Sequence, residues 1–191
     1  MLNDFPKLQK HLSTDLFHSK LCGDTLYIID DYNVDSNMTD EMLQDFVKII
    51  SGVKQIKHVK IYIQKKYSRR KAEVNLFPGK DPKDIEKIRQ NCTKKIQFIE
   101  AFMSHGIECS YIVYPKMKHP FHGRYWLSQT NGFIVDGSIN TAQSKMVLVQ
   151  VMDQENYDLI SDMTKNLFAV NKCDIDEYGL KELNEMFEQY K

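Results

Sequence analysis

The chain has 191 residues with 26 basic and 26 acidic side chains, so its formal net charge is zero. This length is typical of one domain and suffices to bury a core without disulfide bonds. Zero net charge excludes a whole-molecule field that would by itself attract a polyanion. The four cysteines are far apart in the sequence, which predicts free thiols and a reducing, cytoplasmic compartment.

Membrane insertion and secretion are not expected. The first ten residues include Asp4, Lys7 and Lys10, and no later stretch is long and uncharged enough to span a bilayer. We therefore predict a cytoplasmic protein without a transmembrane segment.

Helical and strand-like patterns alternate along the chain. Apolar residues spaced by three or four positions predict helices, and short apolar or alternating runs predict buried or half-buried strands. Helices are expected at 1–23, about 40–51, 82–104, 154–168 and 176–191. Strands are expected at 26–29, 59–63, 111–114 and 146–151, and a polar, basic and mobile loop at 64–80.

A β-hairpin is predicted between the third and the last of these strands. Two apolar runs, Tyr125–Leu127 and Phe133–Val135, flank the sequence Thr130-Asn131-Gly132. Asn-Gly between such runs is the strongest short-range signal for a hairpin. The resulting order of elements predicts an α/β fold, with a mixed sheet flanked by helices in a single domain over 1–191. Its core spans about 26–167, and the terminal helices are extensions.

The polar ends of this hairpin suggest a phosphate site. His122 and Arg124 enter the first strand, and Ser138 and Asn140 follow the second. A hairpin brings these groups together, and the fork of a guanidinium matches phosphate oxygens. The alternative is that His122 only caps a strand while Arg124 is a solvated charge. No metal site is expected, because His119 and His122 are separated by a proline and lack a third ligand.

At these residues the sequence resembles the phospholipase D-like superfamily, whose motif HxKxxxxD is followed by Gly-Gly/Ser-x-Asn. His122 matches the histidine and Gly137-Ser138-Ile139-Asn140 matches the second element, whereas Arg124 replaces the lysine and Gln129 the aspartate. The resemblance implies that His122 attacks phosphorus to form a phosphohistidine, while Arg124, Ser138 and Asn140 bind the phosphate. Since only one motif is present, it also implies a homodimer that supplies two histidines to one site.

The resemblance implies recognition of phosphodiesters, with a nucleic-acid backbone as the expected ligand, in nucleic-acid processing or phage defence. If the protein is an enzyme, it would be a nuclease or phosphodiesterase without metal or cofactor. The two departures leave open a site that binds without cleaving. Five cations could follow a nucleic-acid backbone or simply be solvated, namely Lys65, Lys66, Arg69, Arg70 and Lys71.

Two other functions remain open. The chain could be a non-catalytic module that docks an acidic protein partner or anionic lipid head groups. It could also be a metal-dependent nuclease, because Ile29–Val34 resembles the opening of PIN or NYN nucleases, with Asp30 and Asp31 at the end of a strand. Such an enzyme needs further acids around Mg²⁺, and no second cluster follows a strand. Acids that approach the positive end of a helix would explain the same residues.

Two further patterns have structural explanations. The stretch from Asp174 to Glu185 imitates a calcium-binding loop, but Tyr178 and Lys181 occupy unsuitable positions, so we expect an acidic helix start. The pair Tyr125-Trp126 could stack on a base, although alternation along a strand places at least one of the two rings in the core.

Overall fold

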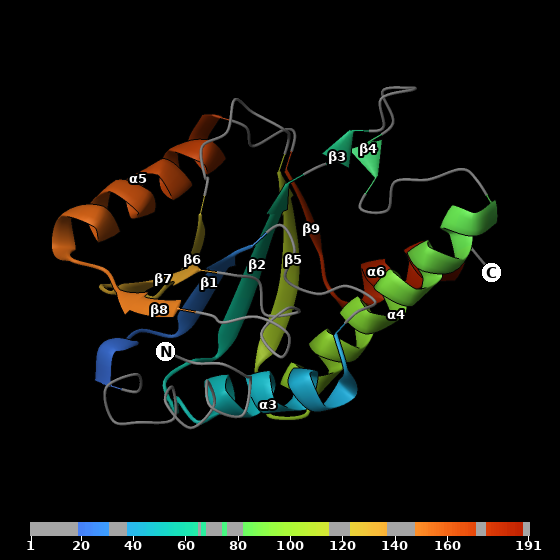
Figure 1. Ribbon diagram of the computed structural model, residues 1–191, viewed down its shortest axis with the longest axis horizontal. Helices are drawn as coiled ribbons and strands as arrows, with labels where there is room; N and C mark the ends of the chain where they lie inside the picture. Colours follow the sequence, from blue (N-terminus) through green and yellow to red (C-terminus); the bar gives the residue numbers. More distant parts are fainter. Residues whose placement is uncertain are drawn as a thin grey trace.

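A mixed sheet of seven strands, with helices on both faces, forms the frame of the domain (Figure 1). The computed structural model describes residues 19–30, 38–64, 66–67, 74–75, 82–114, 123–136, 148–170 and 175–188. These residues form one α/β domain that contains four described helices.

The strand order of the sheet is β8-β7-β6-β1-β2-β5-β9. The three strands β1, β2 and β5 are parallel, and the remaining neighbours are antiparallel. Their bounds are β1 Thr25–Ile29, β2 His58–Gln64, β5 Glu108–Tyr114, β6 Arg124–Leu127, β7 Gly132–Asp136, β8 Leu148–Val151 and β9 Asp176–Tyr178. A separate two-stranded ribbon pairs β3, Lys66–Tyr67, with β4, Val74–Asn75.

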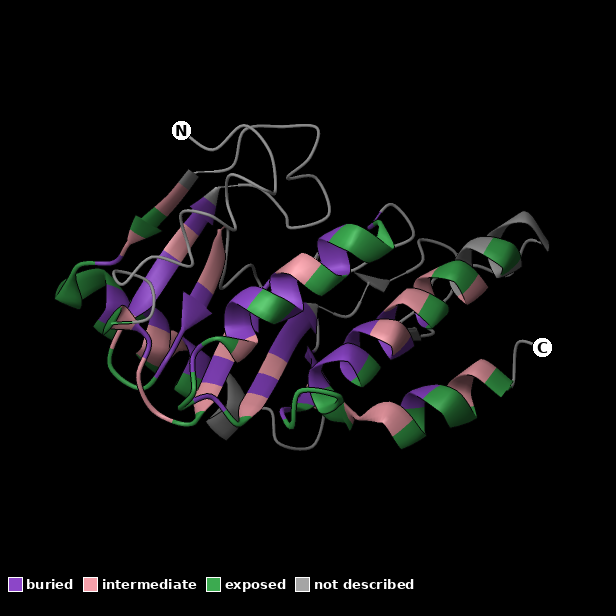
Figure 2. Ribbon diagram, turned by 90° about the horizontal axis from the view of Figure 1, so that it is seen from below, coloured by how far each residue is buried: buried purple, intermediate pink, exposed green. Residues whose placement is uncertain are grey.

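The helices divide between the two faces of the sheet. Helices α3 (Asp40–Ser51), α4 (Pro82–Met103) and α6 (Leu180–Glu188) pack on one face, and α5 (Gln154–Val170) packs on the other (Figure 1). Each packed helix buries one side and exposes the opposite side to solvent, as Figure 2 shows for α3 and α4. The apolar spacing of these helices explains this arrangement, because residues three and four positions apart share a face.

Aromatic rings fill the core between α3, α4 and the sheet. Phe46 stacks on Phe98 with ring centroids 5.6 Å apart, and it meets Trp126 of β6 edge-on at 5.4 Å. Such ring pairs contribute about 0.5–1.5 kcal/mol each beyond the area that they bury. The ring contacts of Trp126 therefore hold β6 against the helices on this face.

Residues that favour the start of a helix stand at the N-termini of α3, α5 and α4. Thr39 caps α3, since its hydroxyl accepts a hydrogen bond from the backbone N–H of Met42 at 3.2 Å. Asp153 caps α5, accepting from the N–H of Asn156 at 2.8 Å. Pro82 is the first residue of α4, where its missing N–H costs nothing.

Three expectations about the elements need correction. Residues 176–178 form strand β9 on β5 rather than the start of the last helix, which begins at Leu180. The stretch 64–80, expected to be a loop, contains the β3–β4 ribbon, in which Tyr67 pairs with Val74. Both are residue types that favour strands. Most of the helix expected at 1–23 lies outside the described residues, and its last residues, from Leu21, are not helical.

The hairpin β6–β7 is confirmed, but its turn differs from the expected Asn-Gly turn. Leu127 pairs with Gly132, so the loop consists of the four residues 128–131 and Gly132 already belongs to β7. A Cβ atom at Gly132 would lie 2.7 Å from Leu127 Cδ2 and 2.9 Å from the carbonyl oxygen of Trp126. The glycine is thus explained by close packing between the strands rather than by a left-handed turn.

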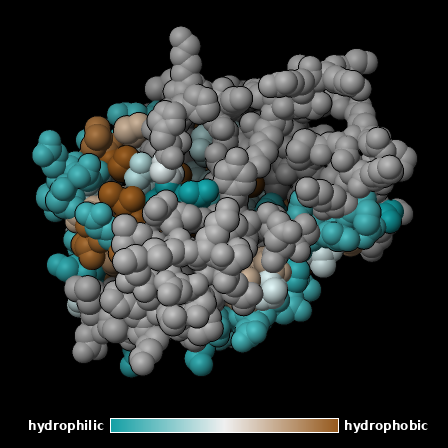
Figure 3. Space-filling model, viewed as in Figure 1, coloured by the Kyte–Doolittle hydropathy of each residue, from teal (hydrophilic) through white to brown (hydrophobic). Residues whose placement is uncertain are grey.

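Within the described part of the chain, no helix is long and apolar enough to cross a membrane. Among the residues that Figure 3 colours, hydrophilic ones predominate, and apolar ones gather on the side of α5.

Candidate functional site

Several strands end at the same edge of the sheet. The parallel strands β1, β2 and β5 all have their carboxyl ends there, and the antiparallel strand β6 begins there. Ile29, the last residue of β1, pairs with Tyr125, the second residue of β6. Asp30 and Arg124, the next residues outward on the two strands, are therefore neighbours at this edge.

Asp30 and Arg124 form an ion pair. The Nε atom of Arg124 lies 3.3 Å from Oδ1 of Asp30. The Asp30 side chain is only 1% exposed, whereas that of Arg124 is 29% exposed, so the pair is buried on the acidic side and reaches solvent on the basic side. The backbone N–H of Asp30 donates to the carbonyl of Tyr62 in β2 at 3.2 Å, which anchors the carboxylate to the centre of the sheet.

Strand alternation explains why these two side chains meet. Asp30 is two residues beyond Ile28, and Arg124 is two residues before Trp126; both apolar side chains are buried in the core on the α3 and α4 face. Because residues two apart on a strand share a face, Asp30 and Arg124 point to that same face. The sequence predicts Arg124 in the phosphate site and Asp30 in the alternative metal site. In the structure the two residues form one ion pair.

Arg124 is the only residue of the predicted phosphate site within the described part of the chain. His122, Ser138 and Asn140 lie outside the described residues, so their convergence stays a prediction. The topology is compatible with it, because Arg124 pairs with Val135 and the end of β7 at Asp136 therefore lies at the same edge as the start of β6.

Gln129, which occupies the aspartate position of the motif, lies at the opposite end of β6. Its backbone N–H donates to the carbonyl of Cys22 at 2.9 Å, and its carbonyl accepts from the Tyr157 hydroxyl at 2.6 Å. Strand β6 separates Gln129 from Arg124. Gln129 therefore belongs to the structure of the hairpin loop, and the carboxylate beside Arg124 comes instead from β1.

The hairpin loop is a network of neutral hydrogen bonds. The Ser128 hydroxyl donates to the carbonyl of Asn131 at 3.0 Å, and the Cys22 Sγ and Thr130 Oγ1 atoms are 2.6 Å apart. The hydrogen bond with the Thr130 side chain is the main cause that lowers the pKa of the Cys22 thiol. A lone cysteine in such a loop does not by itself define a catalytic site.

The predicted basic stretch begins at the same edge as the ion pair. Lys66 lies in β3, which follows the carboxyl end of β2, and its side chain is not described. The other four predicted cations, Lys65, Arg69, Arg70 and Lys71, lie outside the described residues. The backbone thus leaves the sheet near Arg124, as contact with one extended ligand would require.

The aromatic pair of β6 separates as alternation predicts. Trp126 is 1% exposed and packs in the core, so it is not available to stack on a base. Tyr125 is half-buried on the opposite face, beside the residues that pack against α5. A Cβ atom at Gly123 would lie 2.6 Å from the Tyr125 hydroxyl, which explains the glycine between His122 and Arg124.

The rival metal sites gain no support from the geometry. The Asp30 carboxylate already faces a guanidinium, which supplies the positive charge that a metal ion would supply. Asp31 and Asp35 lie outside the described residues, and the described ones contain no group of three or more acidic, histidine or cysteine side chains that could hold a metal. The calcium-like loop is replaced by β9, after which Glu182 accepts from the N–H of Gly179 at 3.0 Å.

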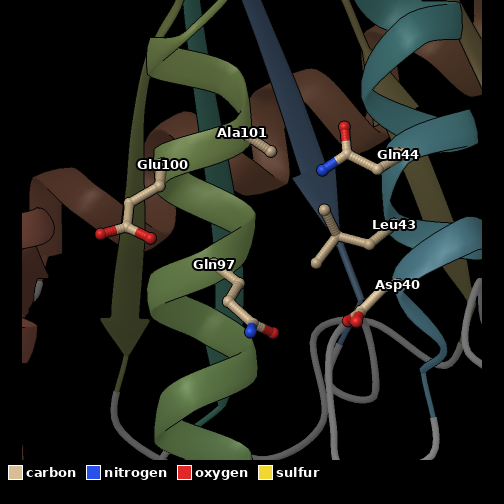
Figure 4. A pocket seen from close by; sticks show the side chains of 6 residues that line it. All are labelled: Asp40, Leu43, Gln44, Gln97, Glu100 and Ala101. Carbon is tan, nitrogen blue, oxygen red and sulfur yellow. The ribbon is translucent and has the colours of Figure 1, made fainter.

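A groove lies between α3 and α4. It encloses about 400 Å³ and is lined by Asp40, Leu43, Gln44, Gln97, Glu100 and Ala101. Figure 4 shows Glu100 pointing away from α3, and Lys94 pairs with Asp40. The lining contains acids and amides but no cation, so the groove does not suit a phosphate.

The fold and the site together define an α/β domain with a buried charge pair at the edge where its parallel strands end. A comparison of the chain with models of protein families, with curated proteins and with solved structures found no match.

Proposed function

We propose that the chain is a phospholipase D-like protein that recognises phosphodiesters, with a nucleic-acid backbone as the expected ligand. The observation that supports this proposal best is the position of Arg124. Its guanidinium is partly exposed at the sheet edge where the motif residues enter and leave the hairpin. Arginine is charged at every relevant pH, and its planar fork suits the oxygens of a phosphodiester.

In the catalytic form of the proposal, His122 is the nucleophile and Arg124, Ser138 and Asn140 bind the phosphate. A nitrogen of His122 forms a bond to phosphorus, and the bond from phosphorus to the leaving oxygen breaks. His122 of a second copy gives its proton to that oxygen, and water later releases the phosphate from the histidine. This scheme needs a homodimer and no metal ion. The binding-only form needs the same phosphate contacts without the transfer.

Binding of short single-stranded DNA and RNA, measured by fluorescence anisotropy, tests the ligand class. Affinity should fall steeply as salt rises, because each neutralised phosphate releases counterions. Replacing Lys65, Lys66, Arg69, Arg70 and Lys71 together should weaken all sequences alike. Arg124→Ala should remove a contact of about 1.5–3 kcal/mol, typical of charged hydrogen bonds.

The folding of each variant needs its own control, because Arg124 also compensates the charge of buried Asp30. The double variant Asp30→Asn with Arg124→Gln keeps a hydrogen-bonding pair and removes both charges. It should bind nucleic acid as weakly as Arg124→Ala while unfolding at a higher temperature. Binding that is equal to the wild type in both variants would remove Arg124 from the site.

The catalytic form is tested separately. Cleavage should survive EDTA and disappear in His122→Ala, since a histidine nucleophile needs no metal. A strictly monomeric species in sedimentation would leave the binding function and exclude the two-histidine scheme. Cleavage that EDTA and Asp30→Ala both abolish would establish the PIN-like alternative instead. Asp30→Asn with Arg124→Gln would then be inactive as well.

An absence of nucleic-acid binding at low salt would favour the docking alternatives, in which the same basic stretch contacts an acidic protein partner or anionic lipid head groups. A reducing, cytoplasm-like location accompanies all of these proposals. It is supported by Cys22, Cys92 and Cys109, which are free thiols.

A further inference from the structure

The ion pair at the sheet edge sets the charge of the proposed phosphate site, and this inference builds on the function proposed above. The Asp30 side chain is 1% exposed and that of Arg124 is 29% exposed, so solvent reaches the pair from the arginine side. A ligand that approaches Arg124 therefore meets a cation whose charge is compensated from the protein side. We propose that Asp30 is a specificity-determining residue that makes the site favour singly charged phosphodiesters over doubly charged phosphomonoesters.

The physical basis is electrostatic. A phosphodiester carries one negative charge, whereas a phosphomonoester carries nearly two above its second pKa of about 6. Beside an isolated arginine, the second charge would add attraction. Beside an arginine paired with a buried carboxylate, the net charge of the pair is zero and the second charge gains little, because Asp30 repels it through a poorly solvated interior.

The pair also keeps the Arg124 guanidinium close to Asp30. Asp30 contacts Nε, the nitrogen nearest to the backbone, at 3.3 Å, and it is itself anchored to β2 through its backbone N–H. The contact is an ion pair without hydrogen-bond geometry, so the charge of Asp30 attracts the guanidinium without setting the plane of its fork. Asp30 thus positions Arg124 without needing to contact the ligand.

Asp30 places a carboxylate beside Arg124, which Gln129 at the aspartate position of the motif cannot do. Gln129 lies beyond the far end of β6, where its backbone bonds with Cys22 and Tyr157 hold it. The carboxylate beside the basic residue of the motif is supplied by β1, an element outside the motif.

Titration with two small esters tests the inference. Dimethyl phosphate and methyl phosphate, at pH 8 and constant ionic strength, represent the singly and the doubly charged ligand, and binding is followed by NMR shifts of backbone amides. The wild type should bind dimethyl phosphate at least as tightly as methyl phosphate. In Asp30→Asn the preference should move toward methyl phosphate by about tenfold, which corresponds to one unit charge partly screened by solvent.

A double-mutant cycle separates specificity from stability. Arg124→Ala should weaken both esters, and Asp30→Asn should still move the ratio of their affinities toward methyl phosphate in the Arg124→Ala background, because the Asp30 charge acts on the ligand directly. A matched control is Glu177→Gln, which removes a carboxylate 3.4 Å from Lys60 on the other face of the sheet and should leave the ratio unchanged. A purely structural role of Asp30 would change both affinities equally.

The outcomes distinguish the two proposals. If Arg124→Ala abolishes ester binding but Asp30→Asn leaves the ratio unchanged, Asp30 does not set specificity and the phosphate site stands. A wild type that prefers methyl phosphate by tenfold or more overturns the inference without any variant. If the wild type binds neither ester at millimolar concentrations, the proposed phosphate site and this inference both fail.

Discussion

The two ends of strand β6 are built by different kinds of interaction. At its start, Arg124 reaches solvent beside the buried carboxylate of Asp30. At its end, the loop over residues 128–131 is closed by neutral hydrogen bonds, and the Tyr157 hydroxyl is 2.8 Å from the carbonyl of Ser128. The start of β6 carries an ion pair, whereas the polar groups at its end form hydrogen bonds with one another.

Under the proposed function, this difference places ligand binding at the start of β6 and stabilising contacts at its end. A closed network of neutral groups fixes the hairpin but leaves little polar capacity for a ligand. A buried carboxylate and a partly exposed guanidinium contribute less to stability than an apolar pair of the same shape would, because both charges lose hydration. Such a pair is therefore better explained by a binding role, and each of the following changes tests that contrast.

The largest effect is expected when Arg124 is removed. Arg124→Ala leaves the buried Asp30 carboxylate without its cation, and we expect the free energy of unfolding to fall by about 3 kcal/mol, the lower end for a broken buried pair. Asp30→Asn should cost less, about 1 kcal/mol, because the exposed arginine can turn toward water. Urea unfolding at pH 7 measures both values.

The double variant Asp30→Asn with Arg124→Gln provides the control for coupling. Its loss of stability should be smaller than the sum of the two single losses, because no uncompensated charge remains. Additive losses would mean that the two side chains do not interact, and they would contradict both the ion pair and the charge argument built on it.

The next effect concerns close packing at the hairpin end. Gly132→Ala places a Cβ atom 2.7 Å from Leu127 Cδ2, and we expect a loss of about 2 kcal/mol, as for other overpacked sites. Gly106→Ala is the matched control, because Gly106 has φ +73° and no atom within 4 Å of the added Cβ. It should lose about 1 kcal/mol from backbone strain alone. Equal losses would show that packing at Gly132 adjusts freely.

The contrast between the two ends also shows what the sequence could reveal. The strands, the helices with their caps and the β6–β7 hairpin follow from periodicity and capping residues, which are local signals. The burial of Trp126 follows from alternation. These features need no knowledge of which strands are neighbours.

The Asp30–Arg124 pair required that knowledge. Strand β6 pairs with β1, although β5 precedes it in the chain, and this order results from long-range packing. A signal was nevertheless present, since both charged residues stand at strand ends two positions from a buried apolar residue. The short strand β9 was not predicted for another reason. The acidic sequence Asp176-Glu177 favours the start of a helix, but in the sheet the negative charge of Glu177 is paired with Lys60.

A smaller effect is expected from the loop network. Tyr157→Phe removes a hydroxyl that is 2.8 Å from the carbonyl of Ser128 and 2.6 Å from that of Gln129. One buried and one partly buried carbonyl lose their shared donor, so stability should fall by about 1 kcal/mol. Nucleic-acid binding per folded molecule should not change, since this network is separated from Arg124 by the length of β6. A loss of binding in folded Tyr157→Phe would contradict the division between the two ends.

The smallest effect is a pH dependence with opposite signs at two thiols. Hydrogen bonding with Thr130 lowers the pKa of Cys22 below 9.0, whereas burial raises the pKa of Cys92 to about 11. A lowered pKa in the folded state adds stability that is present above pH 9 and is lost as the pH falls through the folded value. A raised pKa has the opposite consequence, so the contribution of Cys92 is complete below pH 9 and disappears as the pH rises from 9 toward 11. Relative to the wild type, Cys22→Ser should therefore lose stability mainly above pH 9, and Cys92→Ala should flatten the decline between pH 9 and 11. Thermal unfolding across this range measures both trends, and iodoacetamide labelling of the native protein should modify Cys22 well before Cys92. Equal labelling rates would show that the loop network at the end of β6 does not stabilise the thiolate.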